Sequence, residues 1–384
     1  MKLTHASRRF LALTATAAAL TMLLSACNNS EPFLGEGAAK LGPLPPVSNP
    51  ADNPMTPDKV DLGKMLFFDG RLSGDTSTPC AACHIPDKGW GDGNALSRGY
   101  PGTKHWRNSQ TVLNSAYYTK LFWAGEVTSL EKQADSAATG NLAGNLDPQL
   151  AEERLRQIPE YVQRWQKVFG TAPTWDTALK AIAAFERTIV STNVPFDKYV
   201  QGDKNAISST AKEGLALFAG KANCIQCHSG ALFTNQSFAA IGVPRNKEFD
   251  TDVQRQIALR FQFYSRGVPE AEYRKADDDL GLYYFTKRDQ DKYKFRVPSL
   301  RDLTYTGPYM HNGVFTTLDQ VVDFYNKGGG DVPNKDPRLK PLNLSSSEQK
   351  ALVAFLLSLS GDPVKVDAPK LPEYAPGIPQ APVK

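Results

Sequence analysis

Histidine, cysteine and methionine are scarce in this chain, with five of each among 384 residues. Side chains able to bind a metal or a haem are therefore few. A charge excess is also missing. The formal net charge is +4, and three of the cations, Lys2, Arg8 and Arg9, precede residue 27. Without them 41 Lys and Arg face 40 Asp and Glu, a net charge of +1, which excludes nucleic acid as a partner because phosphates would stay unneutralised.

Long apolar runs are missing too, apart from Phe10–Leu24, which is short for a membrane span. Preceded by basic residues, this run predicts an export signal over residues 1–26. The signal ends Leu-Ser-Ala-Cys at Cys27, similar to a bacterial lipobox, which predicts lipidation of that thiol; a plain secretory signal with an incidental cysteine is the alternative. Since Asn28 follows, we expect a lipoprotein of the Gram-negative outer membrane that faces the periplasm.

Strand signals are weak throughout, and the Pro-rich segments 27–57 and 363–384 are expected to form a linker and a loose tail. Apolar periodicity between them predicts a mostly α protein with few short strands. Capping boxes are expected at Thr128 with Glu131 and at Ser345 with Glu348. The expected helices are Asp58–Phe68, Pro148–Ile158, Pro159–Phe169, Trp175–Val190, Ser208–Ala219, Thr316–Tyr325 and Ser345–Leu359.

Four of the five cysteines fall in two copies of one pattern, Cys-x-x-Cys-His, at residues 80–84 and 224–228. This pattern attaches haem c: the two thiols bond to the haem, and the histidine binds the iron. Two zinc half-sites are the alternative, but zinc needs further Cys or His ligands near each pair. We therefore expect two covalently bound haem c groups, held by Cys80, Cys83 and His84, and by Cys224, Cys227 and His228.

Each haem motif predicts one cytochrome c-like domain, because a helical cage suits a flat apolar macrocycle. We expect an N-terminal haem domain over residues 58–200 and a C-terminal one over 201–362, packed together and joined near 195–206. Residues 247–278 are charged and aromatic and have the character of an insertion. Either solvated covering structure or a partner surface would fit that composition.

The function of each haem depends on the sixth ligand of its iron. A ligand at both positions gives an electron carrier, and an open position admits peroxide. Tyr325 shares a helical face with Leu318, Val321 and Val322, so it faces whatever that helix packs on. From this pattern alone, a core tyrosine and an iron ligand both remain open.

Beyond the haem motifs, the chain resembles the bacterial di-haem cytochrome c peroxidase and MauG family over residues 58–362. The shared segments are LGKMLFFD at 62–69, RNSQTVLN at 107–114, FWAG at 122–125, VPSLR at 297–301 and PYMHNG at 308–313. The resemblance implies that the N-terminal haem reacts with hydrogen peroxide and that the C-terminal haem stores electrons. It also implies Tyr325 as the second-haem ligand, as in MauG-type members, and Trp123 as the electron relay between the haems.

Further roles come from the same resemblance. Asn108, with the backbone carbonyls of Thr306 and Pro308, matches the family's calcium site; such oxygens suit calcium. Gln133 matches a distal glutamine of the first haem, and Gln149 occupies the position of the family's catalytic glutamate. An amide cannot take and return the proton that peroxide cleavage needs, so an acid from elsewhere would have to substitute. The candidate acids are Asp135, Asp147 and Glu126.

The loop after the first motif departs from the family pattern as well. Some members carry a displaceable histidine there, and the nearest positions in this chain are Tyr100 and His105. Either residue could close the first haem, and His105 could equally be a solvated loop histidine.

The sequence thus predicts a periplasmic peroxidase that shares oxidising equivalents between its haems. Its reductant would be a small cytochrome c or cupredoxin, or a protein side chain oxidised in place. Contact with the membrane would be through the lipid anchor only, and the resemblance allows a homodimer. The rival interpretation is a non-catalytic di-haem electron-transfer lipoprotein.

Overall fold

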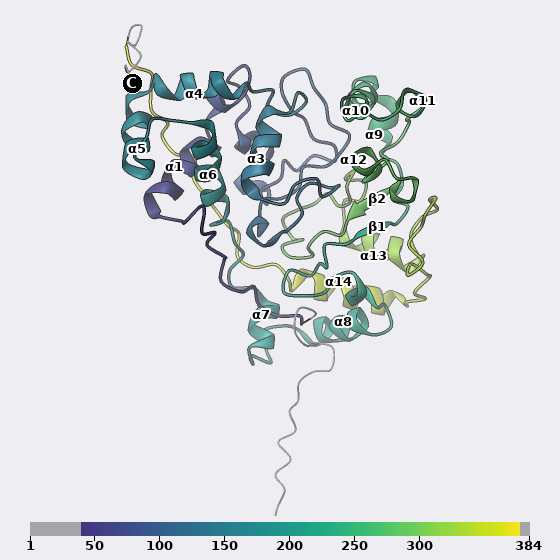
Figure 1. Cartoon of the computed structure of the whole chain (residues 1–384). Coiled ribbons are helices and arrows are strands. Elements are labelled where there is room, and N and C mark those ends of the chain that lie inside the picture. Colours follow the sequence, from purple (N-terminus) through teal and green to yellow (C-terminus); the bar gives the residue numbers. More distant parts are fainter. Residues whose placement is uncertain (1–39, 377–384) are drawn as a thin grey trace, which may run out of the picture. The chain divides into compact units, whose positions relative to one another are not determined.

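The computed structural model describes residues 40–376, so the predicted leader and Cys27 lie outside the described residues. Helices joined by long loops make up this part of the chain (Figure 1), which confirms the predicted mostly α fold with few short strands. None of the described helices has the length and apolar character needed to cross a membrane. The α-helices are α1 (Pro57–Phe67), α2 (Cys80–Cys83), α3 (Leu130–Thr139), α4 (Pro148–Arg156), α5 (Pro159–Phe169), α6 (Trp175–Glu186), α7 (Pro195–Val200), α8 (Ser209–Ala219), α9 (Lys247–Thr251), α10 (Val253–Ser265), α11 (Glu270–Tyr273), α12 (Tyr283–Thr286), α13 (Leu318–Asn326) and α14 (Ser346–Leu357).

Two short strands, β1 (Phe238–Ala240) and β2 (Lys294–Arg296), pair antiparallel with Ala239 opposite Phe295. Short 3₁₀ turns link many of the other elements. They are η2 (Gly70–Leu72), η3 (Pro86–Lys88), η4 (Ser115–Tyr117), η5 (Cys224–Gln226) and η6 (Asp289–Asp291).

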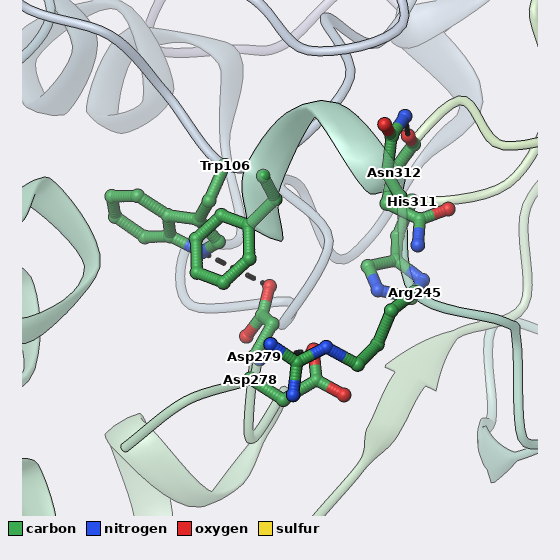
Figure 2. A pocket seen from close by; sticks show the side chains of 8 residues that line it. Trp106, Arg245, Asp278, Asp279, His311 and Asn312 are labelled. Atoms are coloured by element: carbon green, nitrogen blue, oxygen red, sulfur yellow. Dashed lines mark hydrogen bonds between the residues drawn. The ribbon is translucent and has the colours of Figure 1, made fainter. Parts of the chain in front are cut away.

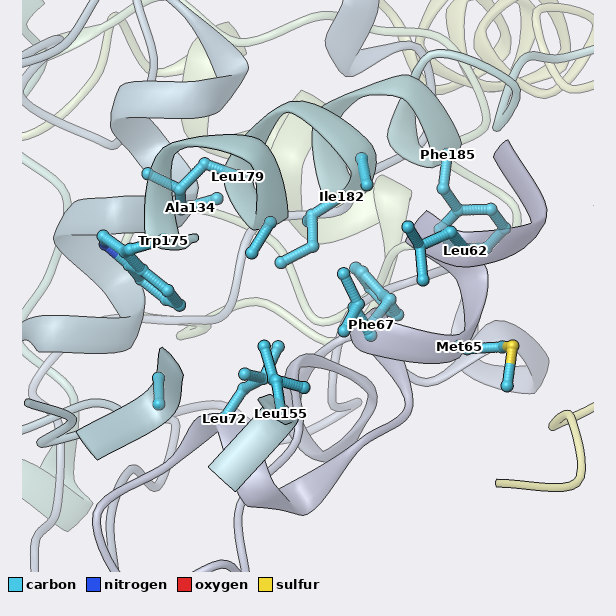
Figure 3. Packing of buried hydrophobic residues seen from close by; sticks show 14 of the residues in the cluster. Leu62, Met65, Phe67, Leu72, Ala134, Leu155, Trp175, Leu179, Ile182 and Phe185 are labelled. Carbon is cyan, nitrogen blue, oxygen red and sulfur yellow. The ribbon is translucent and has the colours of Figure 1, made fainter. Parts of the chain in front are cut away.

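The helix before the first haem motif, α1, begins where the Thr56 side chain accepts a hydrogen bond from the Lys59 backbone. Its apolar face packs on α6, and Figure 3 shows Leu62 and Phe67 against Ile182 and Phe185. The two helices touch backbone to backbone at Gly63, where an added Cβ would lie 1.8 Å from the Ala181 carbonyl oxygen.

The second half repeats this arrangement with α8 and α14. An added Cβ at Gly214 of α8 would lie 2.0 Å from the Ala351 carbonyl oxygen of α14. The predicted capping box of Ser345 and Glu348 is confirmed at the start of α14. Each haem motif thus follows a helix that crosses its partner at a glycine.

The predicted capping box at Thr128 is wrong. The cap of α3 is Ser129, whose hydroxyl accepts from the Lys132 backbone. Glu131 instead accepts hydrogen bonds from the Asn53 amide and the Arg187 guanidinium, because donors from other segments compete for its carboxylate. The helix was found from its local pattern, but its cap lies one residue later.

Two segments expected to be loose pack against the haem-bearing halves. In the linker, Leu41 is buried in the α8–α14 core, and the Gly42 carbonyl accepts a bond from Arg301. In the tail, Val364 packs on the α1–α6 core, and its carbonyl accepts a 2.8 Å bond from the Trp90 indole. Both segments are irregular, as predicted, but their apolar residues are used in packing.

The insertion, residues 247–278, folds into α9, α10 and α11 and contributes to a separate hydrophobic cluster. Trp106 and Ala124, from the loops after the first haem motif, belong to that core. Arg255 of α10 is buried and donates to the Ser97 carbonyl at 2.8 Å, and Lys104 pairs with Asp252 at 2.7 Å. The insertion therefore covers and fixes the loop between residues 97 and 107.

Candidate haem sites and the residues between them

The first haem motif forms a single helical turn, α2. The backbone N–H of His84 donates to the Cys80 carbonyl at 3.0 Å, which keeps the thiols and the imidazole on one short segment. His84 Nδ1–H donates to the Trp90 carbonyl at 3.1 Å. This bond orients the ring and leaves Nε2 with its lone pair, the form that binds a metal.

The second haem motif has the same arrangement. The His228 backbone donates to the Cys224 carbonyl at 2.9 Å, and His228 Nδ1–H donates to the Phe233 carbonyl at 3.0 Å. Phe233 is fully buried. Burial lowers the pKa of His228 to about 4, so the ring is neutral and Nε2 can bind iron.

The motif cysteines fit haem c better than zinc. All four are free of disulfide bonds. Burial raises the pKa of Cys80 and of Cys224 to about 12 each, so these surroundings favour neutral sulfur, as in a thioether, over a zinc thiolate. Across residues 40–376, no group of three His, Cys, Asp or Glu side chains could hold a metal ion. The environments of both motifs therefore suit covalent haem.

Tyr325 lies beside the second motif. It sits near the end of α13, a helix whose capping box is formed by Thr317 and Gln320. Burial raises the pKa of the Tyr325 phenol, and the neighbouring sulfurs of Cys224 and Cys227 raise it further. The phenol is therefore within electrostatic range of both thiols, as a ligand of that haem would be.

Trp123 is held by segments from both halves of the chain. Its indole Nε1–H donates to the Asn108 carbonyl at 3.0 Å, and its own carbonyl accepts from the Arg296 backbone of β2 at 2.8 Å. Its ring lies edge-on to His311, with centroids 6.4 Å apart, and His311 stacks on Phe295 at 3.8 Å. The indole is therefore fixed between a first-half loop and the second-half strand.

Asn108 is tied to the segment expected to complete the calcium site. Its backbone donates to the His311 carbonyl at 2.7 Å, which brings it near the stretch that contains Thr306 and Pro308. Its side-chain Nδ2 donates to the Asn94 carbonyl at 2.8 Å. The calcium site stays a prediction.

The residues expected around peroxide lie in different surroundings. Gln133 is partly buried on α3, whereas Gln149 is exposed in the first turn of α4. Asp147 caps α4 by accepting from the Leu150 backbone at 2.9 Å. Gln149 therefore projects towards solvent at a helix start, and its assignment to the first haem stays a prediction.

The two remaining candidate acids differ in their partners. Asp135 accepts a 2.8 Å bond from the Trp175 indole. One oxygen of Glu126 is buried without a hydrogen-bond partner, and burial raises the pKa of this carboxyl despite the opposing charge of Arg107. Of the three candidate acids, Glu126 is the one with a buried, unpartnered oxygen.

His105, a candidate ligand of the first haem, is engaged elsewhere. Its Nε2–H donates to the Leu142 carbonyl at 2.9 Å, and its backbone carbonyl accepts from Arg255. Burial lowers its pKa to about 4. The ring is therefore held by the Leu142 carbonyl, and both the iron-ligand and the loop-histidine assignments of His105 stay predictions. Tyr100 is partly buried, and its assignment as a ligand stays a prediction.

Sequence reasoning missed a buried ion pair next to these loops. Arg107 donates to Asp279 through Nε and Nη2, and the Trp106 indole donates to the same carboxylate at 3.0 Å. Figure 2 shows Trp106 and Asp279 in a small pocket that His311 also lines. No local signal links partners 172 residues apart in sequence. We see no room there for a cofactor and regard the pair as structural.

A buried carboxyl near the first motif was also missed. Glu186 of α6 is 4% exposed, one of its oxygens lacks a partner, and its charge acts on Cys80. A signal was present, because Glu186 ends an apolar helix that otherwise turns its small and aromatic residues inward.

The fold and the two motifs define a helical protein with two haem c sites. Tyr325 lies near the cysteines of the second site. A family model described as di-haem cytochrome c peroxidase matches residues 57–205. The chain is 59% identical to cytochrome-c peroxidase IdrP1 of Denitromonas iodatirespirans over 88% of this chain and 91% of that protein. It is 38% identical to the methylamine utilization protein MauG of Methylorubrum extorquens over 85% of each chain.

A solved structure, of a MauG-like protein associated with microbial copper homeostasis, aligns with a TM-score of 0.70 at 27% identity, over 85% of this chain and 96% of that one. The chain belongs to the di-haem cytochrome c peroxidase and MauG family and is a peroxidase-type oxidoreductase. Membership implies two haem c groups, as the motifs predict.

Proposed function

We propose that this enzyme reduces hydrogen peroxide at the haem bound by His84 and shares the two oxidising equivalents with the haem bound by His228 and Tyr325. Trp123 relays electrons between the two sites. The reductant is a small cytochrome c or cupredoxin, or a protein side chain oxidised in place. The name of the relatives, cytochrome-c peroxidase, supports a cytochrome c as the reductant.

One observation carries the proposal: the two motifs differ in what lies near them. Tyr325 stands beside the thiols of the second motif, whereas His105, the histidine nearest the first, is bonded to Leu142. Tyr325 would close the iron of the second haem, and the first haem would keep a position for peroxide if Tyr100 does not bind its iron. Burial raises the pKa of the Tyr325 phenol, so a bound ferric iron would have to supply the positive charge that favours its deprotonated form.

The haem groups supply the redox chemistry, and the chain supplies position and protons. Trp90 and Phe233 fix the two proximal rings through their carbonyls. Gln133 is assigned to orient peroxide at the first haem. The acid that moves the proton is assigned to Glu126, since Gln149 is an exposed amide.

Calcium and location complete the proposal. A calcium ion would bind the Asn108 side chain and the carbonyls of Thr306 and Pro308, and so join the two haem-bearing halves. The protein would reside in the periplasm, anchored to the outer membrane through Cys27. Haem c is attached in that compartment, which agrees with the two motifs.

Low-temperature EPR of the oxidised protein, before and after one equivalent of hydrogen peroxide, tests the proposal. We expect a high-spin signal beside a low-spin one, both lost on adding peroxide. Two low-spin signals that ignore peroxide, in the oxidised and in the half-reduced protein, would rule the proposal out.

The second candidate function is a di-haem electron carrier. The exposed amide of Gln149, at the position where the family places its acid, favours it. This candidate predicts six-coordinate iron at both haems and no peroxide consumption with a reduced donor. Measurable turnover would exclude it.

A further inference from the structure

A surface hollow lies directly beside Trp123. Ala124 and Gly125, the next two residues of the chain, line it, as do Phe238 of β1 and Lys294 of β2. The backbone of Arg296, two residues after Lys294, donates to the Trp123 carbonyl at 2.8 Å. The hollow therefore shares its wall with the segment that holds the relay tryptophan.

The lining of this hollow is positively charged. Three cations, Lys120, Arg288 and Lys294, face one carboxylate, Asp291, a net charge of +2. Asp291 accepts hydrogen bonds from Arg288 at 2.8 Å and from Lys294 at 3.3 Å, so one carboxylate is shared by two cations and cannot neutralise both. Lys120 donates to the Gln236 carbonyl, and Arg288 is 61% exposed. The excess charge is therefore available to an anionic partner.

An aromatic side chain stands in the same hollow. Phe285 of α12 is 50% exposed, while its neighbours Tyr283 and Tyr284 are buried. The short helix is anchored by those two side chains, so the exposed ring is presented from a fixed base. An exposed aromatic side chain among charged ones is a composition found at protein docking sites.

We propose that this hollow is the docking site for a small acidic redox protein, which passes electrons to the enzyme through Trp123. The inference rests on the proposed function and adds to it the charge of the donor and its place of contact. Each donor is oxidised by one electron. Two donors and two protons thus convert one hydrogen peroxide to two waters.

The charge of the hollow makes a kinetic test possible. The double variant Lys120→Glu and Arg288→Glu reverses the charges of two cations that line the hollow. Arg164→Glu with Lys167→Glu, on the exposed face of α5, makes the same change in net charge at a distance and serves as control. The probes are a reduced acidic cupredoxin and a reduced basic cytochrome c.

With the acidic donor we expect the hollow variant to raise KM by about tenfold and to flatten the dependence on ionic strength, because electrostatic steering is lost. With the basic donor the KM of the hollow variant should fall or stay unchanged. The control variant should have the wild-type KM for both donors. An unchanged KM for the acidic donor, or an equal change in the control, would overturn the proposal.

Two further measurements separate the inference from the function on which it rests. The spectral change on adding one equivalent of peroxide without donor reports the enzyme alone, and it should be the same in all variants. Titration with the oxidised acidic cupredoxin reports docking without turnover. If the wild-type spectrum did not change on adding peroxide, the proposed function would fail. The titration would still show whether the acidic protein binds at the hollow.

Phe285→Ala tests the same hollow independently, in case the charge-reversal variant does not fold. It removes the apolar centre and no charge. We expect weaker docking of the acidic donor with an unaltered salt dependence. Binding as tight as in wild type would count against the hollow.

Discussion

Arg107 and Asp279 form a buried ion pair in which Nη2 lies 2.9 Å from Oδ1 and Nε bonds the second oxygen. Both side chains are largely removed from solvent, at 11% and 4% exposure. Arg107 belongs to the loop after the first haem motif and Asp279 follows the insertion. The pair therefore ties the insertion to the loop that precedes Trp123.

Replacing Asp279 by Asn should destabilise the protein by about 3 kcal/mol or more, because the Arg107 charge would stay buried without a counter-ion. Denaturant unfolding measures this. Asp323→Asn is the control, since its pair with Lys327 is exposed and should contribute less than about 1 kcal/mol. Equal losses in both variants would contradict the structural role.

Replacing Tyr325 by Phe should change the low-spin EPR and visible spectrum of the second haem and leave the first haem as it is, because only the second iron loses a ligand. Tyr309→Phe is a matched control from the same half. It removes one hydroxyl bond, to the Leu303 carbonyl, at a cost of about 1 kcal/mol. An unaltered spectrum in Tyr325→Phe would remove the ligand assignment.

Replacing Trp123 by Phe should leave both haem spectra intact and lower donor turnover about tenfold, equivalent to about 1.4 kcal/mol in the barrier. The indole bond to the Asn108 carbonyl is lost with the relay ring. Stopped-flow oxidation of a reduced donor measures the effect. Trp175→Phe, in the first-half core, is the control and should affect stability without slowing electron exchange.

Glu186 should make stability depend on pH. Burial raises its pKa from 4.5 to about 8; Arg187 lowers the pKa, while Glu131 adds to the increase. The unfolded carboxyl ionises near 4.5 and the folded one keeps its proton, so folding takes up a proton between these values. Stability contributed by the group is fully present below pH 4.5 and lost as the pH rises through 8, at up to about 1.4 kcal/mol per pH unit.

Urea unfolding of wild type and Glu186→Gln between pH 5 and 8 measures that slope. The variant carries no titrating group there and should unfold with a flatter pH dependence. Parallel pH profiles would show that Glu186 is ionised in the folded protein.

Replacing Gly63 by Ala should cost about 1–3 kcal/mol, because the new methyl group would overlap the Ala181 carbonyl and force α1 away from α6. Thermal unfolding measures the loss. Gly42→Ala is the control, since an added Cβ there meets nothing within 4 Å. A neutral result at Gly63 would mean that the helix crossing adjusts freely.

Features carried by neighbouring residues could be predicted from the sequence. The haem motifs are contiguous, the faces of α6 and α13 follow from helical spacing, and the cap of α14 needs only Ser345 and Glu348. The resemblance added the family, which the comparisons confirm. It also supplied the predicted roles of Tyr325 as an iron ligand and Trp123 as an electron relay.

What the sequence by itself determined is therefore the haem chemistry, the helical fold and the family, because each depends on local spacing or on whole-chain similarity. The tertiary structure alone decided the rest. It pairs Arg107 with Asp279, bonds His105 to Leu142, and returns the tail to Trp90. It also leaves Gln149 exposed and opens a cationic hollow beside Trp123. These contacts join segments far apart in the chain, and their energies come from burial and charge, which no local pattern records.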